Sequence, residues 1–516
     1  MVMTRSASSF ELILSPRPEG MPSFHWVRNA LRAEILSGRI SPGSRLPASR
    51  DFARQYHLSR GTILTALDEL QAEGYLETRR GSGTYVSKTL PEDMSQLEGV
   101  AELEANQRMH RGRQLSDFGA RVMPFSMNVK PNSRAFRTNL PALDLFPTTV
   151  WAQVSGRRLR RASTRSLLGC EAQGYLPLRQ AVARYAHSSR GVSCDADQVV
   201  IVSGIQEGLD LTTRLLLNPG DKVLMEDPGY QGAYAIFHAM GARVLSAPLD
   251  VEGATPKESD VRSCRLLFLT PGHQYPMGMT MSLQRRLQLL AWAKKYDTTI
   301  FEDDYDSEFR FAGRPIPAMQ GLDRAGRVIF CGSFNKVMFP SLRLGYIVLP
   351  REMVEIFART KALTTRHQPL LDQAVLCDFI EQGHLGRHLR RMRKTYEERL
   401  SVLLECVRED LGEYMEIATM EAGLQVTGIF HHHTDAELVA HRAAIEEVDV
   451  IPLSRFCNTV TVPEGLQIGF AAVDEKAIRS GVRRLLQVFE RLKAEGLLGK
   501  PLHNNPREHI NTAVSL

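Results

Sequence analysis

From Pro141 onward the sequence alternates short apolar runs with segments of helical character, and this alternation restricts the fold more than any other feature. Strands and helices that alternate at this scale predict an α/β domain built on a mainly parallel sheet. After Gln373 a basic, helix-rich stretch is followed by mixed helix and strand patterns up to Lys500, which predicts a smaller α+β subdomain. The apolar runs are Val199–Val202, Lys222–Met225, Leu266–Thr270, Thr299–Phe301, Val328–Cys331 and Leu344–Leu349.

A second pattern lies ahead of this domain. Apolar residues at helical spacing predict a helix over 22–37, and a short helix is expected over 48–56. Ser59 can cap a further helix over 59–73, and residues 75–86 have the pattern of two short strands around a glycine-containing tip. The order is a helix, then a helix-turn-helix, then a β-hairpin. It predicts an α+β winged helix-turn-helix.

These patterns divide the chain into three parts. We expect the winged helix-turn-helix over 20–88, a linker over 89–139 and the α/β domain over 140–495. The middle stretch has no sustained periodicity and mixes charge with Met, Gln and Ser. A loop of this length inside a compact domain would be unusual, so an interdomain linker, partly helical, fits it better.

The start of the predicted recognition helix carries short polar and basic side chains, Ser59, Arg60 and Thr62. Such side chains at a helix start can meet phosphates and base edges. Arg80 and Gly81 fall at the hairpin tip, where glycine lets the backbone approach DNA. Residues 21 to 88 hold ten Lys or Arg against six Asp or Glu. The pattern favours DNA binding over a small helical domain with a solvated basic face.

Lys336 stands about thirty residues after Asp303 and Tyr305, which lie at the end of an apolar run. Because side chains alternate along a strand, Asp303 and Tyr305 can face one side together. An amine that forms a Schiff base, a carboxylate that keeps a pyridine nitrogen protonated and a phenol that meets a ring hydroxyl are the needs of pyridoxal 5′-phosphate (PLP). The spacing therefore predicts a PLP site.

Groups suited to the cofactor's phosphate follow the apolar run at 199–202. The next residues, 203–206, lead into a helix whose first backbone N–H groups can hold an anion. Ser333 and Arg343 would add a hydroxyl and a charge-assisted hydrogen bond. Tyr230 either borders the cofactor ring or is a core aromatic residue after a turn, and the sequence leaves both open.

The N-terminal runs Gly43–Arg50, Leu58–Thr62 and Glu73–Val86 resemble a GntR-type winged helix-turn-helix. By that resemblance the residues that would contact DNA are Arg45, Arg50, Ser59, Arg60, Thr62, Arg80, Gly81 and Ser82.

The runs Thr270–Gly278, Glu302–Arg310, Gly332–Tyr346 and Gly383–Arg393 look like the aminotransferase fold, PLP fold type I. Together with the N-terminal module they resemble MocR-type regulators. The resemblance implies a head-to-tail homodimer with PLP sites near the subunit interface. It also implies a cofactor-binding set of Gly204, Ile205, Gln206, Tyr230, His273, Asp303, Tyr305, Ser333, Lys336 and Arg343.

Four residues depart from the pattern of this family. Asn139 stands where Gly is usual, Asn335 replaces a Ser before the Schiff-base lysine, and Gln425 replaces a common His. Gln467 occupies a position where enzymes of this fold often carry an Arg that clamps a substrate carboxylate bidentately. A neutral amide cannot replace that clamp.

Composition limits the expected compartment and the kinds of site that the chain can contain. The seven cysteines are scattered and none has metal-site spacing, which predicts reduced thiols in a cytoplasm and no metal. The His431–His433 triplet has no partner at ligand spacing. No apolar run approaches the length of a membrane helix, and the first twenty residues lack the order of a signal peptide.

We therefore expect a cytoplasmic transcriptional regulator that binds operator DNA and senses a small amine-bearing effector, or PLP itself, through Lys336. Productive turnover is not expected, because Gln467 would not hold a carboxylate; if one is held, Arg442 and Arg455 are candidates. The alternatives are an aminotransferase with an accessory DNA-binding domain and a scaffold that has lost PLP. Lys336, Asp303 and Tyr305 argue against the scaffold.

Overall fold

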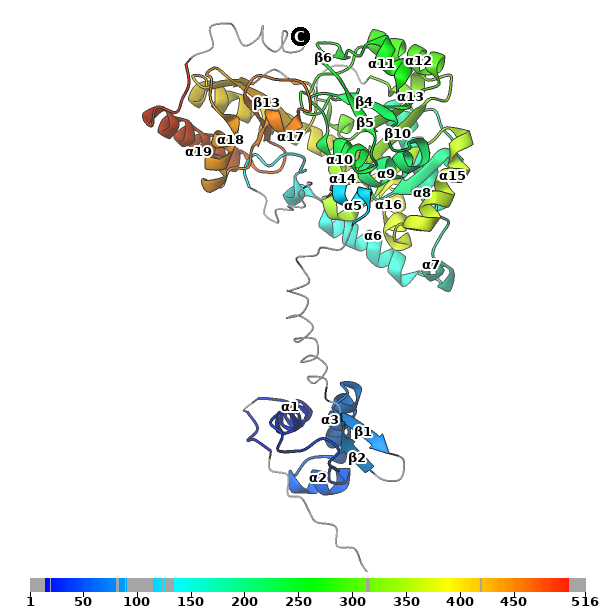
Figure 1. Cartoon of the computed structure of the whole chain (residues 1–516), viewed down its shortest axis with the longest axis vertical. Coiled ribbons are helices and arrows are strands. Elements are labelled where there is room, and N and C mark those ends of the chain that lie inside the picture. Colours follow the sequence, from blue (N-terminus) through cyan, green and yellow to red (C-terminus); the bar gives the residue numbers. More distant parts are fainter. Residues whose placement is uncertain are drawn as a thin grey trace, which may run out of the picture. The chain divides into compact units, whose positions relative to one another are not determined.

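The computed structural model describes residues 14–18, 20–79, 83–88, 90, 115–122, 125, 134–311, 316–417 and 420–500. The chain forms two compact units, Met1–Gln114 and Leu115–Leu516, each described here by itself (Figure 1). Among the described residues, no helix combines the length and the apolar character that crossing a membrane requires.

The first unit is a winged helix-turn-helix. Its elements are α1 (Ser23–Leu36), α2 (Ser49–Gln55), α3 (Arg60–Ala72), β1 (Leu76–Arg79) and β2 (Gly83–Val86). The strands pair antiparallel, and apolar side chains from all three helices and both strands form one core. This agrees with the order expected from the sequence.

The segment before α1, in which the sequence showed no clear pattern, also packs on this unit. Leu14 is buried, and its backbone N–H donates to the hydroxyl of Tyr56 at 2.9 Å. The indole of Trp26 donates to the carbonyl of Ser15 at 2.8 Å. Leu14 therefore extends the core of the first unit, whereas residues 15–18 are exposed.

The second unit is built on a seven-stranded sheet in the order β3-β11-β10-β9-β8-β4-β5. Only β11 runs antiparallel to its neighbours. Alternate residues of β3 enter different hydrophobic clusters, so both faces of the sheet are covered. The strands are β3 (Val199–Val202), β4 (Lys222–Glu226), β5 (Arg243–Ala247), β8 (Leu266–Leu269), β9 (Thr299–Asp304), β10 (Val328–Ser333) and β11 (Gly345–Val348).

The predicted α/β domain with a mainly parallel sheet is confirmed, and the six apolar runs all form its strands. The edge strand β5 was not predicted, because most of its residues are only partly buried and it lacks a continuous apolar run.

Helices enclose this sheet (Figure 1). They are α5 (Asp117–Val122), α6 (Thr148–Arg160), α7 (Thr164–Leu168), α8 (Leu176–Arg190), α9 (Ile205–Leu216), α10 (Gln231–Ala239), α11 (Glu258–Ser263), α12 (Leu283–Tyr296), α13 (Met319–Leu322), α14 (Phe334–Val337), α15 (Arg351–Thr364) and α16 (Leu370–Glu381). A small hairpin joins β6 (Leu249–Asp250) and β7 (Gly253–Ala254).

The expected smaller α+β subdomain follows. Its antiparallel sheet has the order β12-β13-β15-β14, formed by Met415–Ile417, Gln425–Phe430, Gly465–Gly469 and Ile451–Pro452. The helices are α17 (His384–Asp410), α18 (Ala436–Ile445) and α19 (Glu475–Ala494). Residues 134–139, at the end of the proposed linker, also join it, because Ala135 bridges Val448 and Phe136 bridges Gly469.

Candidate functional site

Strand β9 presents different chemistry on its two faces. Asp303 on β9, and Tyr305 just beyond it, line a cavity of about 410 Å³. The other residues that line the cavity come from several elements: Arg137, Thr138, Asn139, Leu140, Gly204, Ile205, Gln206, Tyr230, Tyr275, Ser333, Asn335, Lys336, Pro340 and Arg343.

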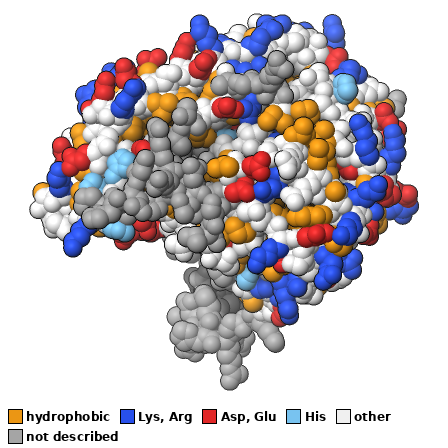
Figure 2. All heavy atoms as spheres, turned by 90° about the horizontal axis from the view of Figure 1, so that it is seen from above, with side chains coloured by type: hydrophobic (Ala, Val, Ile, Leu, Met, Phe, Trp, Pro, Cys, Tyr) orange, Lys and Arg blue, Asp and Glu red, His pale blue; other side chains and the backbone are white. Residues whose placement is uncertain are grey.

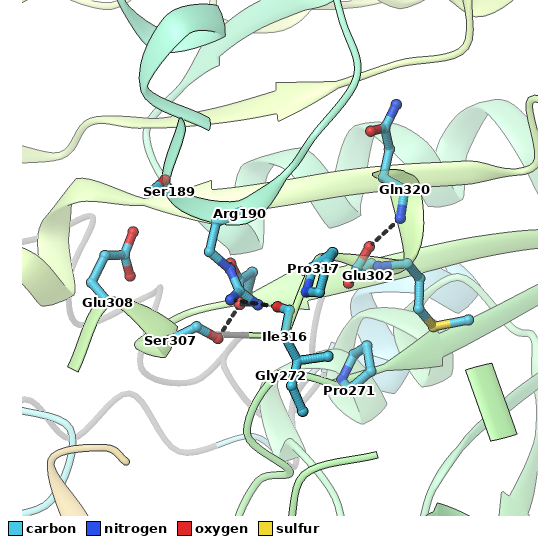
Figure 3. A network of polar contacts seen from close by, with 12 residues as sticks. Ser189, Arg190, Pro271, Gly272, Glu302, Ser307, Glu308, Ile316, Pro317 and Gln320 are labelled. Atoms are coloured by element: carbon cyan, nitrogen blue, oxygen red, sulfur yellow. Dashed lines mark hydrogen bonds and ion pairs between the residues drawn. The ribbon is translucent and has the colours of Figure 1, made fainter. Parts of the chain in front are cut away.

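The opposite face of β9 is held by the polar network in Figure 3. Arg190 donates to the Asp304 carboxylate from Nε at 2.6 Å and from Nη2 at 3.2 Å, and Ser307 donates to the same carboxylate. Glu302 accepts the backbone N–H groups of Met319 and Gln320 at 2.8 and 2.9 Å. Because buried polar groups with satisfied partners rigidify their surroundings, this network fixes the strand that carries Asp303.

Lys336 lies on the one-turn helix α14, directly after β10. Its Nζ donates to the carbonyl oxygen of Asn139 at 3.0 Å. Burial lowers the pKa of Lys336 to about 8, although the carboxylates of Asp306 and Asp303 act to raise it. More of this lysine is therefore the neutral, nucleophilic amine near neutral pH than of an ordinary lysine, although the protonated form still predominates.

Asp303 lies in the same cavity, and none of the described residues forms an ion pair with it, although the charge of Lys336 acts on it. Its Oδ1 is buried and has no hydrogen-bond partner among the described residues. Burial, with a smaller contribution from Asp304, raises the pKa of Asp303 well above its ordinary value. A buried carboxylate of this kind requires a cation, and the protonated ring nitrogen of PLP would supply one.

The loop before α9 forms a binding site for an anion, the phosphate cup, together with Asn335 and Arg343. Gly204 adopts φ +149°, and a Cβ there would lie 2.9 Å from Nδ2 of Asn335. Asn335 donates to the carbonyl of Ser203 at 2.8 Å and accepts the N–H of Leu344 at 3.0 Å. Arg343 reaches the hydroxyl of Ser203 at 3.4 Å. The helix start, the guanidinium and the hydroxyls suit a phosphate.

These features fit PLP: an amine, a buried carboxylate that lacks a cation and a phosphate cup surround one cavity. Of the predicted cofactor-binding set, only His273 does not line the cavity. It lies behind Tyr305, with Nδ1 3.0 Å from the Tyr305 hydroxyl.

Three of the four departures from the family pattern meet in one network. The backbone N–H of Asn139 donates to Oε1 of Gln425 at 2.8 Å, and its side chain donates to the hydroxyl of Tyr275 at 2.8 Å. That hydroxyl donates to Oε1 of Gln467 at 3.2 Å. Gln467 is fully buried, and its Nε2 has no partner among the described residues. Neutral amides and a phenol thus surround the position at which enzymes of this fold often carry an Arg that clamps a carboxylate, as the sequence predicts.

Arg442 and Arg455, the candidates for a carboxylate, are both outside the cavity. Arg442 pairs with Glu495 at 2.7 Å and Arg455 pairs with Glu437, in partly exposed ion pairs. That suggestion was wrong, because the two side chains are held on the surface of the smaller subdomain. Arg137 lines the cavity instead. It was missed because it precedes Asn139 in a stretch without periodicity.

In the first unit, the candidate DNA-contacting residues gather at the starts of α2 and α3. Ser59 caps α3, its Oγ accepting the N–H of Thr62 at 3.1 Å. Arg60 Nε donates to Ser49 Oγ at 3.3 Å, next to Arg50. The side chain of Arg45 lies beside Gly83 at the start of β2. Arg80, Gly81 and Ser82 lie outside the described residues.

Three of these arginines, Arg45, Arg50 and Arg60, have no ion-pair partner within the described part of the first unit, whereas Arg28, Arg32, Arg39, Arg54 and Arg79 are each paired. On the face shown in Figure 2, by contrast, basic and acidic side chains are interspersed. The unpaired positive charge of the first unit is suited to phosphate contacts.

Two protein families match the chain, one in each unit, and the relatives described next match across both units. The aminotransferase class I and II family matches residues 138–485, and the bacterial regulatory proteins of the gntR family match residues 26–86. The probable rhizopine catabolism regulatory protein MocR of Rhizobium meliloti is 37% identical over 94% of this chain and 98% of its own length. The HTH-type pyridoxine biosynthesis transcriptional regulator PdxR of Corynebacterium glutamicum is 29% identical over 87% of this chain and 92% of its own.

Among solved structures, the α-aminoadipate aminotransferase LysN of Thermus thermophilus, complexed with N-(5'-phosphopyridoxyl)-L-leucine, matches with a TM-score of 0.66. It is 27% identical, and the match covers 74% of this chain and 98% of that one. The second unit therefore has the fold of PLP-dependent aminotransferases.

Proposed function

We infer the function from a family assignment: this chain belongs to the MocR-type transcriptional regulators, which join a GntR-type winged helix-turn-helix to an aminotransferase-like domain with PLP as cofactor. We propose that the first unit binds operator DNA and that the second unit senses a small primary amine, or PLP itself, at Lys336. The single observation that carries the proposal is the cavity in which Lys336, Asp303 and the phosphate cup converge.

When bound, PLP supplies an aldehyde that condenses reversibly with primary amines. The residues of this chain would each hold one part of it. Asp303 would pair with the ring nitrogen, and Ile205, Gln206, Ser333 and Arg343 would hold the phosphate. Lys336, with its lowered pKa, supplies the protein's own amine, and an effector amine competes with it.

Sensing without turnover is favoured by the network around Gln467. Transamination needs the substrate held so that the lysine can move a proton, and a misplacement of about 1 Å can lower the rate roughly a hundredfold. Asn139, Tyr275, Gln425 and Gln467 offer no positive charge to an α-carboxylate. Arg137 also lines the cavity and could meet an α-carboxylate, but the residues at the position of the usual clamp are neutral, so common α-amino acids would bind without the bidentate hold that orients them for reaction.

We also propose a head-to-tail homodimer that acts in the cytoplasm, where operator DNA is found. Exposed large apolar side chains are usual at protein interfaces. In the second unit such side chains occur around α6, α7 and the end of α15: Leu159, Leu167, Leu168, Leu176 and Leu363.

The test compares spectroscopy with product formation. Purified full-length protein incubated with PLP should show a visible absorbance band, and Lys336→Ala should not. A panel of amines and common amino acids should perturb the band of the wild type, while keto-acid release stays negligible. Steady release at about 1–1000 per second would support the alternative, an aminotransferase with an accessory DNA-binding domain.

A further inference from the structure

We propose that His273 and Asp306 are positioning residues that turn the hydroxyl hydrogen of Tyr305 toward the cavity, where the ring oxygen of PLP can accept it. The proposal rests on the proposed binding of PLP at Lys336. Both residues are buried, at 3% and 0% exposure, and neither lines the cavity. Their hydrogen bonds can therefore reach the cofactor only through Tyr305, although the charge of Asp306 also acts on Lys336.

Three oxygens crowd one nitrogen of His273. Its Nδ1 lies 2.9 and 3.1 Å from the two carboxylate oxygens of Asp306 and 3.0 Å from the hydroxyl of Tyr305. An ionised carboxylate only accepts hydrogen bonds. Both oxygens of Asp306 lie within hydrogen-bonding distance of Nδ1, as expected of a carboxylate that accepts from one N–H. Nδ1 must therefore carry the hydrogen.

The other ring nitrogen points to the same tautomer. Nε2 of His273 is buried and has no partner among the described residues. A hydrogen there would be an unsatisfied buried donor, which costs about 1–3 kcal/mol. The acceptor at Asp306, and the lack of a hydrogen-bond partner for Nε2 among the described residues, thus both place the hydrogen on Nδ1.

This tautomer decides what Tyr305 can do. Since Nδ1 is a donor, the Tyr305 oxygen can only accept from it, and the tyrosine's own hydrogen is left for another acceptor. Tyr305 lines the cavity, so that hydrogen points toward the site of the cofactor ring. A phenol that accepts one hydrogen bond also donates a stronger one.

Two glycines fix the imidazole against the backbone. A Cβ on Gly423 would lie 2.2 Å from Cε1 of His273 and 3.1 Å from Oδ2 of Asp306. A Cβ on Gly278 would lie 3.3 Å from Nε2 of His273. The rings of His273 and Tyr305 are stacked with centroids 5.8 Å apart. The sequence therefore leaves space for this imidazole in one position.

The experiment uses full-length protein loaded with PLP and follows the pH dependence of its visible absorbance band. A hydrogen bond from Tyr305 stabilises the anionic ring oxygen and so favours the form of the bound cofactor that has lost its proton. Losing that bond should raise the midpoint pH by about one unit. Asp306→Ala and Asp306→Asn are a matched pair: both remove the charge, but only alanine removes the acceptor for Nδ1–H.

We expect Asp306→Ala to raise the midpoint above that of Asp306→Asn by most of the shift seen in Tyr305→Phe. In the Tyr305→Phe background, the difference between the two Asp306 variants should disappear. Equal midpoints for the two Asp306 variants would overturn the proposal, because charge alone would then explain the effect. A wild-type protein without any absorbance band would instead contradict PLP binding itself. Circular dichroism identifies a variant that fails to fold. If Asp306→Ala does not fold, His273→Phe replaces it and should raise the midpoint relative to wild type. An unchanged midpoint in His273→Phe would overturn the proposal.

Discussion

Glu226, at the end of β4, is a buried carboxyl that forms no ion pair with any of the described residues. Its Oε2 accepts from the backbone N–H of Thr270 at 3.1 Å and also from that residue's hydroxyl, and Oε1 has no partner among the described residues. Burial raises the pKa of Glu226 from 4.5 to about 7. The folded protein therefore holds this proton more tightly than the unfolded chain does.

The sign of the pH dependence follows from linkage. Because the folded-state pKa is the higher one, the stabilisation is fully present below about pH 4.5 and is lost as the pH rises through about 7. Glu226→Gln keeps an oxygen for Thr270 and stays neutral at every pH. Between pH 5 and pH 8, wild type should lose up to about 3 kcal/mol more unfolding free energy in urea than the variant. Equal losses would show that Glu226 does not titrate in this range.

At this scale the sequence predicts which residues have the required chemical groups but not which distant residues contact one another. Lys336, Asp303 and Tyr305 can be recognised because PLP requires an amine, a carboxylate and a phenol. The hydrogen bond from Asn139 to Gln425 spans 286 residues of sequence. A single sequence contains no signal that such distant amides meet, so the neutral network was seen only as separate departures.

At the scale of elements, strand β9 shows why the sequence was informative. Strict alternation sends Asp303 to the cavity and Asp304 to Arg190, so one short strand carries a residue of the site and a residue of the network that supports it. The other buried strands of this sheet are predictable from their continuous apolar runs. The edge strand β5 and the two-residue strand β14 lack such runs, and only tertiary pairing defines them.

The helix pair α2 and α3 supports a prediction about DNA. Arg60→Ala and Arg50→Ala should each weaken operator binding, by about 1–3 kcal/mol where the side chain reads a base. The matched control is Arg54→Ala on the same helix as Arg50, because Arg54 is 83% exposed and pairs with Asp51. Operators can be selected from random duplexes with wild-type protein, and affinities measured by fluorescence anisotropy. If all three variants bind as wild type does, α3 is not the recognition helix.

The whole molecule joins a DNA-binding unit to a cofactor-binding unit, and regulation requires that the two sites share one equilibrium. Residues 134–139 are well placed to take part, because they form the end of the proposed linker and pair with the smaller subdomain. Asn139, their last residue, accepts the hydrogen bond from Lys336. When Lys336 changes its bonding partner, the hydrogen bond to Asn139 would be lost, and Asn139 belongs to the segment that connects to the DNA-binding unit.

This arrangement predicts a reciprocal effect between PLP and DNA. If PLP changes the affinity for the selected operator by some factor, thermodynamic linkage requires that the operator changes the affinity for PLP by the same factor, typically about 5–150-fold. Both can be measured on full-length protein, one by anisotropy of labelled DNA and the other by absorbance of bound PLP. Lys336→Ala should bind the operator while losing most of the coupling, since its side chain no longer reaches Asn139. A ligand shifts an equilibrium solely through its different affinities for the two states. If neither PLP nor the operator changes the affinity for the other, the winged helix-turn-helix only tethers the second unit to DNA.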